Sequence, residues 1–279
     1  MLVIAVVSSV FSSCEKDRSE IKTDLLYEVA IDGNTVTFSI KTDGVSGVKW
    51  DFGDGATSTE ANPTHTYAGK GKYVPTLLAS VNGKSAEAST VLRIAKTSPV
   101  KIDDNTFEDW LKVTKDVIPL GTSKGIFNNV KLDYDGNYIY IYGEMAGQKS
   151  DGVIFDFYID ADNSLSTGLL TATFTAGAFD ILLEGPLLNT GMDIFYHNST
   201  DQNSFSFAQQ SIADAYTVGT VKDGQGTVQF EVRIARGKLK GLTGSGLRLG
   251  IQATKSDWSV TLGNAPDFGT ASYFLDMSE

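Results

Sequence analysis

Apolar and polar residues alternate along several short stretches of this chain. Within residues 35–40, Val36, Phe38 and Ile40 alternate with threonine and serine, and residues 152–160 repeat the pattern. Successive side chains of a β-strand point to opposite faces, so this period of two predicts strands that are buried on one face.

The same pattern predicts about eight or nine short strands in the later part of the chain. The clearest are residues 129–133, 138–144, 152–160, 179–183, 193–197, 228–234, 247–253 and 272–275. Asp-Gly-Asn at 135–137 is typical of a hairpin turn between two of them. Only residues 107–113 and 235–239 suggest short helical turns. The regular spacing of short strands predicts an all-β fold.

With 279 residues the chain is long for one sandwich and comfortable for two. Thr97-Ser98-Pro99 is a plausible linker. We therefore predict a leader and tether at 1–23, a first β-sandwich at 24–97, and a larger, jelly-roll-like sandwich at 98–279.

Charge and cysteine content argue against several classes of partner and metal site. Asp plus Glu number 34 against 23 Lys plus Arg, a formal net charge of -11. No basic patch or stripe stands out, so nucleic acid is not an expected partner. A single cysteine excludes an internal disulfide and a cysteine-based zinc site, and two histidines argue against a histidine-rich one. The carboxylates remain available for calcium.

The chain starts with an apolar run at residues 1–11, shorter than the roughly 20 residues that a membrane-spanning helix needs. Its length is typical of the core of a secretory signal. Ser12 and Ser13 then precede Cys14. Two interpretations stay open. In the first, Cys14 is lipidated and becomes the first residue of the mature protein, and the position of this sole cysteine favours that interpretation. In the second, Cys14 is an incidental residue of a plain signal peptide.

Residues 15–20 are polar and are predicted to be a tether. Phe-Ser-Ser-Cys-Glu-Lys-Asp at 11–17 resembles lipoprotein signals of the Bacteroidetes. This resemblance implies a lipid-anchored protein of the outer membrane that faces the cell exterior. No Lys or Arg precedes the apolar run, which is compatible with a start codon upstream.

The first sandwich carries a specific motif. Trp-Asp-Phe-Gly-Asp-Gly at 50–55, Asn-Pro-Thr-His-Thr-Tyr at 62–67 and Gly-Lys-Tyr at 71–73 follow in order. This stretch resembles the PKD domain, an immunoglobulin-like sandwich that serves as a spacer or protein-interaction module in extracellular proteins. Asp51 and Asp54 could suggest a catalytic pair, but Asp-Gly and Gly-Asp-Gly make tight turns. We interpret both carboxylates, and His65, as structural.

The second sandwich also resembles a known group. Ile-Asp-Asp-Asn at 102–105, Asp109-Trp110, Phe-Tyr-Ile-Asp-Ala-Asp-Asn at 157–163 and Phe-Glu-Val-Arg-Ile at 230–234 occur in order. Together they resemble family 9 carbohydrate-binding modules and the related DOMON-like sandwiches. Haem-binding DOMON relatives use axial ligands such as Met and His, but the single histidine of this domain, His197, makes haem a poor fit.

Asp160, Asp162 and Asp180 are the candidate metal ligands. Carboxylates two residues apart in a loop can hold calcium, so Asp160 and Asp162 come first. The resemblance implies further acidic ligands from elsewhere in the fold, with Asp180 and Glu184 as weaker candidates. The loop is not an EF-hand, because the glycine and terminal glutamate of that motif are missing. The alternative is an Asx-rich turn that satisfies its own backbone. A bound ion would be structural.

Sugar-binding modules stack aromatic rings on pyranose faces. Trp110 lies among apolar neighbours and is predicted to be core. Trp258 has polar and turn-forming flanks and is a candidate platform, with ordinary core as the alternative. Tyr196 is a second candidate ligand residue, and alternation places it on the face opposite Phe195 and His197. We do not expect His197 to be a catalytic base.

These features predict a non-catalytic surface lipoprotein that binds a polysaccharide or oligosaccharide. The resemblances imply a polysaccharide-capture system beside an outer-membrane glycan transporter, with the PKD-like domain as spacer. A structural or adhesive lipoprotein that contacts another protein remains the alternative. A glycoside hydrolase would need two placed carboxylates, and no acid/base motif stands out.

Overall fold

A computed structural model describes residues 24–242 and 244–278. The predicted leader and tether at 1–23, including Cys14, lie outside the described residues. No helix in the described part has the length and apolar content of a membrane span.

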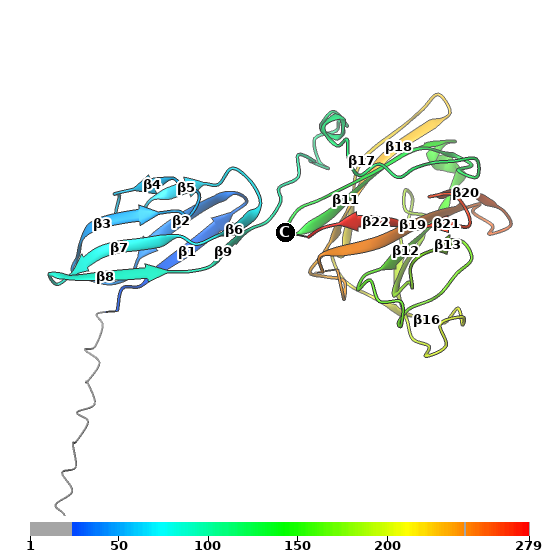
Figure 1. The fold of residues 1–279 in the computed structure, drawn as a ribbon. Coiled ribbons are helices and arrows are strands. Elements are labelled where there is room, and N and C mark those ends of the chain that lie inside the picture. The colour runs from blue at the N-terminus through cyan, green and yellow to red at the C-terminus, as the bar shows by residue number, and fades with distance from the viewer. Residues whose placement is uncertain (1–23, 243, 279) are drawn as a thin grey trace, which may run out of the picture. The chain divides into compact units, whose positions relative to one another are not determined.

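The chain divides into two compact units (Figure 1). The first contains the described residues up to Thr66 together with Tyr73–Leu92, and the second contains Tyr67–Lys72 and the residues from Arg93 onward. The all-β class predicted from the alternation is confirmed, since the described residues form strands and two short 3-10 helices.

From Asp24 onward, where the described residues begin, the first part of the chain forms nine strands. They are β1 (Tyr27–Asp32), β2 (Thr35–Ile40), β3 (Val45–Asp51), β4 (Thr57–Ser58), β5 (Thr64–Thr66), β6 (Gly71–Tyr73), β7 (Thr76–Val81), β8 (Lys84–Ser89) and β9 (Leu92–Ile94). One sheet has the order β1-β2-β5 and a second has the order β4-β3-β7-β8, while β6 pairs with β9. Two facing sheets make this unit a small β-sandwich.

Aromatic side chains fill the core of this first sandwich. Trp50 and Phe38 are fully buried, with ring centroids 5.0 Å apart, and Phe52 lies 5.3 Å from Phe38. Trp50 Nε1 donates a hydrogen bond to the Glu60 carbonyl at 3.1 Å, so its polar edge is satisfied. Burial of such rings is the main stabilising contribution in a unit of this size.

Thirteen further strands lie in the described residues of the second unit. They are β10 (Phe127–Tyr134), β11 (Tyr138–Ala146), β12 (Ile154–Asp160), β13 (Phe174–Thr175), β14 (Ile181–Gly185), β15 (Asp193–His197), β16 (Phe207–Gln210), β17 (Tyr216–Gly224), β18 (Thr227–Ala235), β19 (Gly246–Thr254), β20 (Thr261–Ala265), β21 (Thr270–Ala271) and β22 (Tyr273–Asp276). The 3-10 helices η1 (Asp109–Lys112) and η2 (Lys149–Asp151) complete it.

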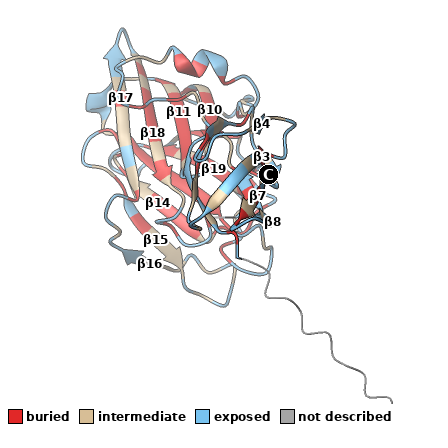
Figure 2. Cartoon of the chain, turned by 90° about the vertical axis from the view of Figure 1, so that its left-hand side faces the viewer, coloured by how far each residue is buried: buried red, intermediate tan, exposed pale blue. Residues whose placement is uncertain are grey.

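Two sheets enclose the core of the second unit. The smaller sheet has the order β10-β11-β18-β17, and the larger has the order β16-β15-β14-β12-β19-β20 with β22 also paired to β19. Buried residues concentrate in the middle strands such as β11, whereas β17 at the sheet edge is mostly half-buried or exposed (Figure 2). Phe155, Phe157 and Phe230 lie in this core. The unit is the predicted second β-sandwich.

A segment at residues 98–117 covers the outer face of the smaller sheet. Trp110 in η1 packs there against Val100, Ile102 and Tyr142. The prediction that Trp110 is a core residue is confirmed by its exposure of 2%. The helical turn predicted at 107–113 is realised as η1. The one predicted at 235–239 is a single hydrogen-bonded turn at 236–238 and not a helix, because β18 continues through Ala235. In this turn the Lys238 amide donates to the Ala235 carbonyl at 3.1 Å.

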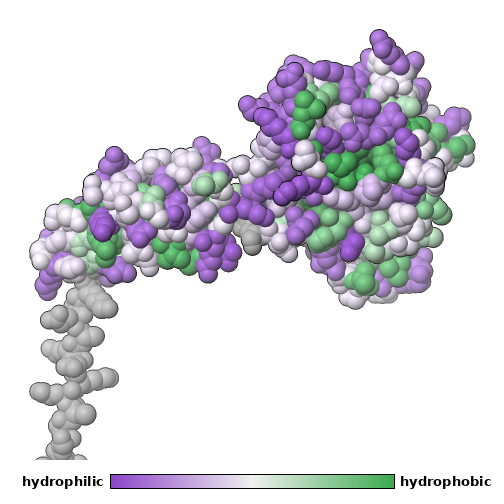
Figure 3. All heavy atoms as spheres, turned by 45° about the horizontal axis from the view of Figure 1, so that its top comes forward, coloured by the Kyte–Doolittle hydropathy of each residue, from purple (hydrophilic) through white to green (hydrophobic). Residues whose placement is uncertain are grey.

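The outer face of the larger sheet is apolar on the side that lies toward Asp160. Tyr158 and Leu182 form a cluster there with Phe174 and Phe179, which come from the segment between β12 and β14. The face shown in Figure 3 is largely hydrophilic or neutral, and hydrophobic patches lie on both units. That surface agrees with the excess of acidic residues in the chain.

Candidate ligand and cation site

Three carboxylates converge at one end of the larger sheet. Asp160 ends β12, Asp162 follows in the loop, and Asp180 immediately precedes β14. One oxygen from each lies within 4.8 Å of the others. Antiparallel pairing of β12 with β14 produces this meeting, because it brings the end of one strand beside the start of the other. The structure thus places all three predicted metal ligands together.

Backbone hydrogen bonds hold the carboxylates in place. Asp160 accepts from the amides of Asn163 at 2.8 Å and Ala178 at 3.2 Å. Asp180 Oδ2 accepts from the Ala161 amide at 3.1 Å, and Asp162 accepts from the Ser164 amide at 2.8 Å. The loop therefore orients the carboxylates before any ion binds, and each retains lone pairs for a cation.

The electrostatics of this group favour a cation. Burial raises the pKa of Asp180 to about 6, and the charges of Asp162 and Asp160 add to the effect. Burial also raises the pKa of Asp160. None of the ion pairs among the described residues involves these three carboxylates. Arg248 partly offsets the charge of Asp160 without forming an ion pair. Three carboxylates that offer oxygen ligands are the donor set that calcium prefers.

A cleft of about 1190 Å³ opens beside the carboxylates. Asp162 and Asp180 line it together with Tyr196, and its walls are rich in amide, hydroxyl and ammonium groups. These come from Thr167, Asn198, Ser199, Thr200, Gln202, Gln210, Lys238 and Lys240. A wall of mixed donors and acceptors suits a hydroxylated ligand.

Tyr196 occupies this cleft in a partly structural role. Its ring packs against the main core, and its hydroxyl accepts a hydrogen bond from the Lys240 amide at 3.0 Å. Tyr196 pairs with Ile181 in the register between β15 and β14, so it lies at the Asp160 end of the sheet. One predicted ligand residue therefore shares a cleft with two predicted metal ligands.

Trp258 lies at the other end of the sheet. It occupies the tip of the hairpin between β19 and β20, past the pair Ile154–Thr254, whereas Asp160 pairs with Arg248. A strand advances about 3.3 Å per residue, so roughly 20 Å separates the two ends. The structure does not bring Trp258 and Tyr196 into one site.

The hairpin presents Trp258 in an unusual conformation. Its exposure is 53%, which agrees with the prediction from its flanks, and its φ is 63°. A positive φ is a genuine outlier for a bulky residue. The turn is held by the Trp258 amide donating to the Lys255 carbonyl at 2.8 Å, and Asp257 accepts from the Ser259 amide at 3.1 Å. The turn therefore fixes the backbone beneath an exposed indole.

The two histidines have structural surroundings. His197 Nε2 lies 3.1 Å from the Ser204 carbonyl, and its ring packs edge-on against Phe207. His65 Nε2 lies 2.7 Å from Asp54 Oδ2, and its ring stacks on Phe52 at 4.2 Å. Neither arrangement supplies a nucleophile.

The acidic turn of the first sandwich has the predicted structural role. Asp51 accepts from the Gly53 amide at 2.9 Å, and Asp54 accepts from the Ala56 amide at 3.0 Å. Burial works against ionisation of Asp54, but hydrogen bonds from His65 and Ala56 outweigh it and lower its pKa. Both carboxylates shape the turn.

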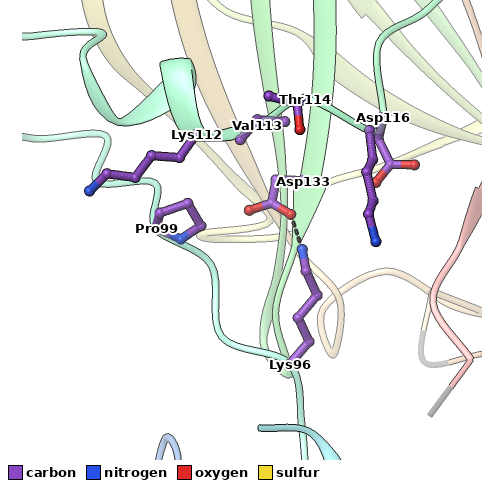
Figure 4. Close-up of a pocket in the computed structure, with 8 residues that line it drawn as sticks. Lys96, Pro99, Lys112, Val113, Thr114, Asp116 and Asp133 are labelled. Atoms are coloured by element: carbon purple, nitrogen blue, oxygen red, sulfur yellow. Dashed lines mark hydrogen bonds and ion pairs between the residues drawn. The ribbon is translucent and has the colours of Figure 1, made fainter.

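A second, smaller pocket of about 230 Å³ lies near the start of the second unit (Figure 4). Lys96, Lys112, Lys115, Asp116 and Asp133 line it. Lys96 forms an ion pair with Asp133, whose other oxygen accepts from Ser98 Oγ at 2.6 Å. Burial lowers the pKa of Lys96. Its ammonium is thus already paired, and the pocket is too small for an oligosaccharide.

Sequence reasoning missed Asp156 and Glu231 and did not pair Glu184 with Asp156, although the structure makes all three prominent. Asp156 and Glu184 form a cross-strand pair on the outer face of the larger sheet, and Glu231 lies fully buried beneath Trp110. Glu184 is also a weaker candidate metal ligand by sequence, but the group of three carboxylates found among the described residues does not include it. The sequence feature that could have identified Asp156, Glu184 and Glu231 is an acidic residue within an otherwise apolar strand.

The first unit is the part of the chain that most clearly resembles known proteins. Residues 27–95 match the PKD domain family. Collagenase ColA of Bacillus cereus is 40% identical over 74 residues, which are 26% of this chain and only 7% of that protein's length. The PKD1 domain of the Vibrio cholerae metalloprotease PrtV is 32% identical, covering 25% of this chain and 93% of that domain, with a TM-score of 0.24.

A further similarity extends over both units. A solved structure described as a carbohydrate-binding module of the β-sandwich superfamily is 14% identical, covering 82% of this chain and 94% of that chain with a TM-score of 0.28. The sequence motif at 50–73, the two facing sheets and the family match agree for the first unit, and residues 27–95 are a PKD domain.

Proposed function

We propose that this protein is a non-catalytic, glycan-binding lipoprotein of the bacterial cell surface, anchored in the outer membrane through Cys14. The second sandwich binds the glycan, and the PKD domain acts as a spacer. The protein then belongs to a polysaccharide-capture system and delivers glycan to an outer-membrane transporter. We also propose that the second sandwich is related to family 9 carbohydrate-binding modules and DOMON-like domains.

The observation that carries the proposal is the cleft beside Asp162, Asp180 and Tyr196. Its volume of about 1190 Å³ can accommodate several sugar rings, and amides, hydroxyls and ammonium groups line it. Calcium held by Asp160, Asp162 and Asp180 would fix the loop that forms one wall. The ion would therefore act as a structural cofactor of the cleft.

Affinity electrophoresis tests this proposal. The full chain carrying Cys14→Ser is run in gels that contain plant, fungal or host polysaccharides, with calcium or with EDTA. We expect retardation by one class of glycan, and weaker retardation in Gln210→Ala and Lys240→Ala, which change the cleft. Asp43→Asn, an exposed acid of the first unit, is the matched control.

The absence of retardation on every polysaccharide, with a folded sample, contradicts glycan binding. Release of reducing sugar by the purified protein contradicts the non-catalytic part of the proposal. Labelling with a radioactive fatty acid in wild-type but not Cys14→Ser cells tests the lipid anchor separately.

An adhesive role is the second candidate, and the hairpin tip favours it. Trp258 and Val260 are 53% and 52% exposed at the same turn. Paired apolar side chains at a protruding tip suit contact with a protein surface. If Trp258→Ala abolishes co-purification of an outer-membrane protein but leaves glycan retardation unchanged, this second role is supported.

A further inference from the structure

A row of polar side chains crosses the outer face of the larger sheet. Asn264 on β20 pairs with Gln252 on β19, Gln252 with Asp156 on β12, Asp156 with Glu184 on β14, and Glu184 with Asp193 on β15. Directly paired residues share one face of a sheet. Because Phe155 and Phe157 alternate with Asp156 and point into the core, this row faces outward.

Asp156 at the centre of the row lacks a donor. Its exposure is 4%, and its buried Oδ1 has no hydrogen-bond donor among the described residues. The neighbouring polar group is the carboxyl of Glu184, and two carboxyls bond to each other only when one carries a proton. Like charges directly opposite on a sheet are destabilising. The arrangement therefore lowers stability unless the pair shares a proton or meets a ligand.

The surrounding groups explain why the pair keeps a proton near neutral pH. Burial raises the pKa of Asp156 to about 7, and the charge of Glu184 adds to this. Burial also raises the pKa of Glu184, with Asp193 contributing from β15. Tyr158 faces the pair along β12 and remains neutral, and Gln252 on β19 carries no charge. None of the ion pairs among the described residues reaches this row.

The geometry distinguishes between a cation and a hydroxylated ligand. Neighbouring strands lie about 4.8 Å apart, so the five side chains form a line of roughly 19 Å. A calcium ion needs several oxygens around one point, 2.3–2.6 Å away, and the Asp160 triad, not this row, is the acidic group of that kind in the described chain. A line of two amides followed by three carboxyls offers donors at one end and mainly acceptors at the other, and suits hydroxyls spread along a sugar chain.

Solvent reaches the row from one side. Asp193 is exposed and Glu184 and Gln252 are half-buried, whereas Asn264 and Asp156 are buried. Asp156 is one methylene shorter than Gln252 and Glu184 on either side of it, so its carboxyl lies below theirs. A ligand hydroxyl therefore meets the half-buried Glu184 and Gln252 first, and reaches the unpaired Oδ1 of Asp156 only where these two side chains part. Gln252 Nε2 donates to Asn264 Oδ1 at 3.0 Å and holds the amide end of the row.

We propose that this row is a second binding subsite, separate from the cleft, and that Asp156 and Glu184 recognise a neutral, hydroxylated sugar chain as a proton-sharing pair. The inference rests on the proposed glycan-binding function and adds a place and a chemistry to it. The shared proton gives the pair one donor and several acceptors. Loss of that proton above neutral pH removes the donor, so binding weakens.

Affinity electrophoresis at pH 6 and pH 8 on the same polysaccharide panel tests the inference, with the full chain carrying Cys14→Ser. We expect Asp156→Ala to weaken retardation at least tenfold at pH 6. Asp156→Asn keeps a permanent donor and acceptor, so it should retain binding at both pH values, whereas wild-type binding falls three- to tenfold from pH 6 to pH 8. Gln252→Ala, at a half-buried position, is the second variant if Asp156→Ala does not fold.

The outcomes separate the two proposals. If no polysaccharide retards the wild-type chain, glycan binding itself fails and this inference fails with it. If the wild type is retarded but Asp156→Ala and Gln252→Ala behave like it, only the row is excluded and the cleft remains. Equal pH dependence in wild type and Asp156→Asn overturns the proton-sharing pair. Asp43→Asn should match the wild type throughout.

Discussion

Trp110 donates its indole Nε1–H to Glu231 Oε2 at 2.8 Å, although 121 residues separate the two in the chain. Glu231 is fully buried and also accepts from the Thr220 amide at 3.1 Å. This bond ties the segment that covers the smaller sheet to its central strand β18. The segment therefore closes the sandwich through a buried polar contact as well as through apolar packing.

We predict that Trp110→Phe lowers the free energy of unfolding by about 1–3 kcal/mol, because a buried carboxylate loses a donor while most of the apolar packing stays. Urea unfolding followed by fluorescence measures the change. Leu111→Ala is the matched control, since Leu111 is the next residue of η1 and is 74% exposed. Equal effects of the two variants would contradict the role of the bond.

Calcium should stabilise the second sandwich through Asp160, Asp162 and Asp180. An ion present at 100 times its Kd adds about 2.7 kcal/mol to the folded state, and a domain of this size gains roughly 2–4 °C per kcal/mol. Calorimetry should show a rise of several degrees from EDTA to calcium at pH 7. Asp162→Asn should lose this response. A wild-type melting temperature that is the same in both buffers would exclude the site.

Stability without calcium should fall as pH rises. The pKa values of Asp156, near 7, and Asp180, near 6, exceed the unfolded value of 3.8. The folded state therefore binds more protons between pH 4 and 7. The stability from this uptake is complete below pH 4 and is lost as pH passes through the raised values.

Melting temperatures in EDTA should accordingly decrease from pH 5 to pH 8, by roughly 2–4 °C for each kcal/mol lost. Asp156→Asn should flatten the profile, because its amide does not ionise. A wild-type profile that rises over this interval would show that the buried acids do not control the stability.

His65 should stabilise the PKD domain. His65→Ala removes the 2.7 Å contact with Asp54 and the ring stacked on Phe52 at 4.2 Å, so we expect a loss of about 1–2 kcal/mol. Because the pKa of Asp54 is lowered in the fold, its contribution is present above pH 4 and disappears as the pH falls further. Denaturant unfolding of wild type and variant at pH 7 and pH 3 measures both effects. Equal stability of the two proteins at pH 7 would contradict the stabilising role, and an equal difference at the two pH values would contradict the pH dependence.

The sequence by itself determined the all-β class, most of the central strands and the three carboxylates Asp160, Asp162 and Asp180 that the structure brings together. Alternation with period two is a local property, and it marked the strands that became β12 and β15 correctly. It missed β17, where the register shifts between Val218 and Val221, and the short edge strand β16. A bulge or a half-exposed edge weakens the alternation on which the prediction depends.

Only the tertiary structure decided which side chains meet. Strand order and register placed Asp156 opposite Glu184 and put Trp258 and Tyr196 at opposite ends of one sheet. The same non-local packing put Glu231 beneath Trp110. Pairing depends on contacts between residues far apart in the chain, and a shift of one residue would turn every side chain of a strand to the other face. The local alternation of apolar and polar residues therefore does not determine which strands pair or in which register.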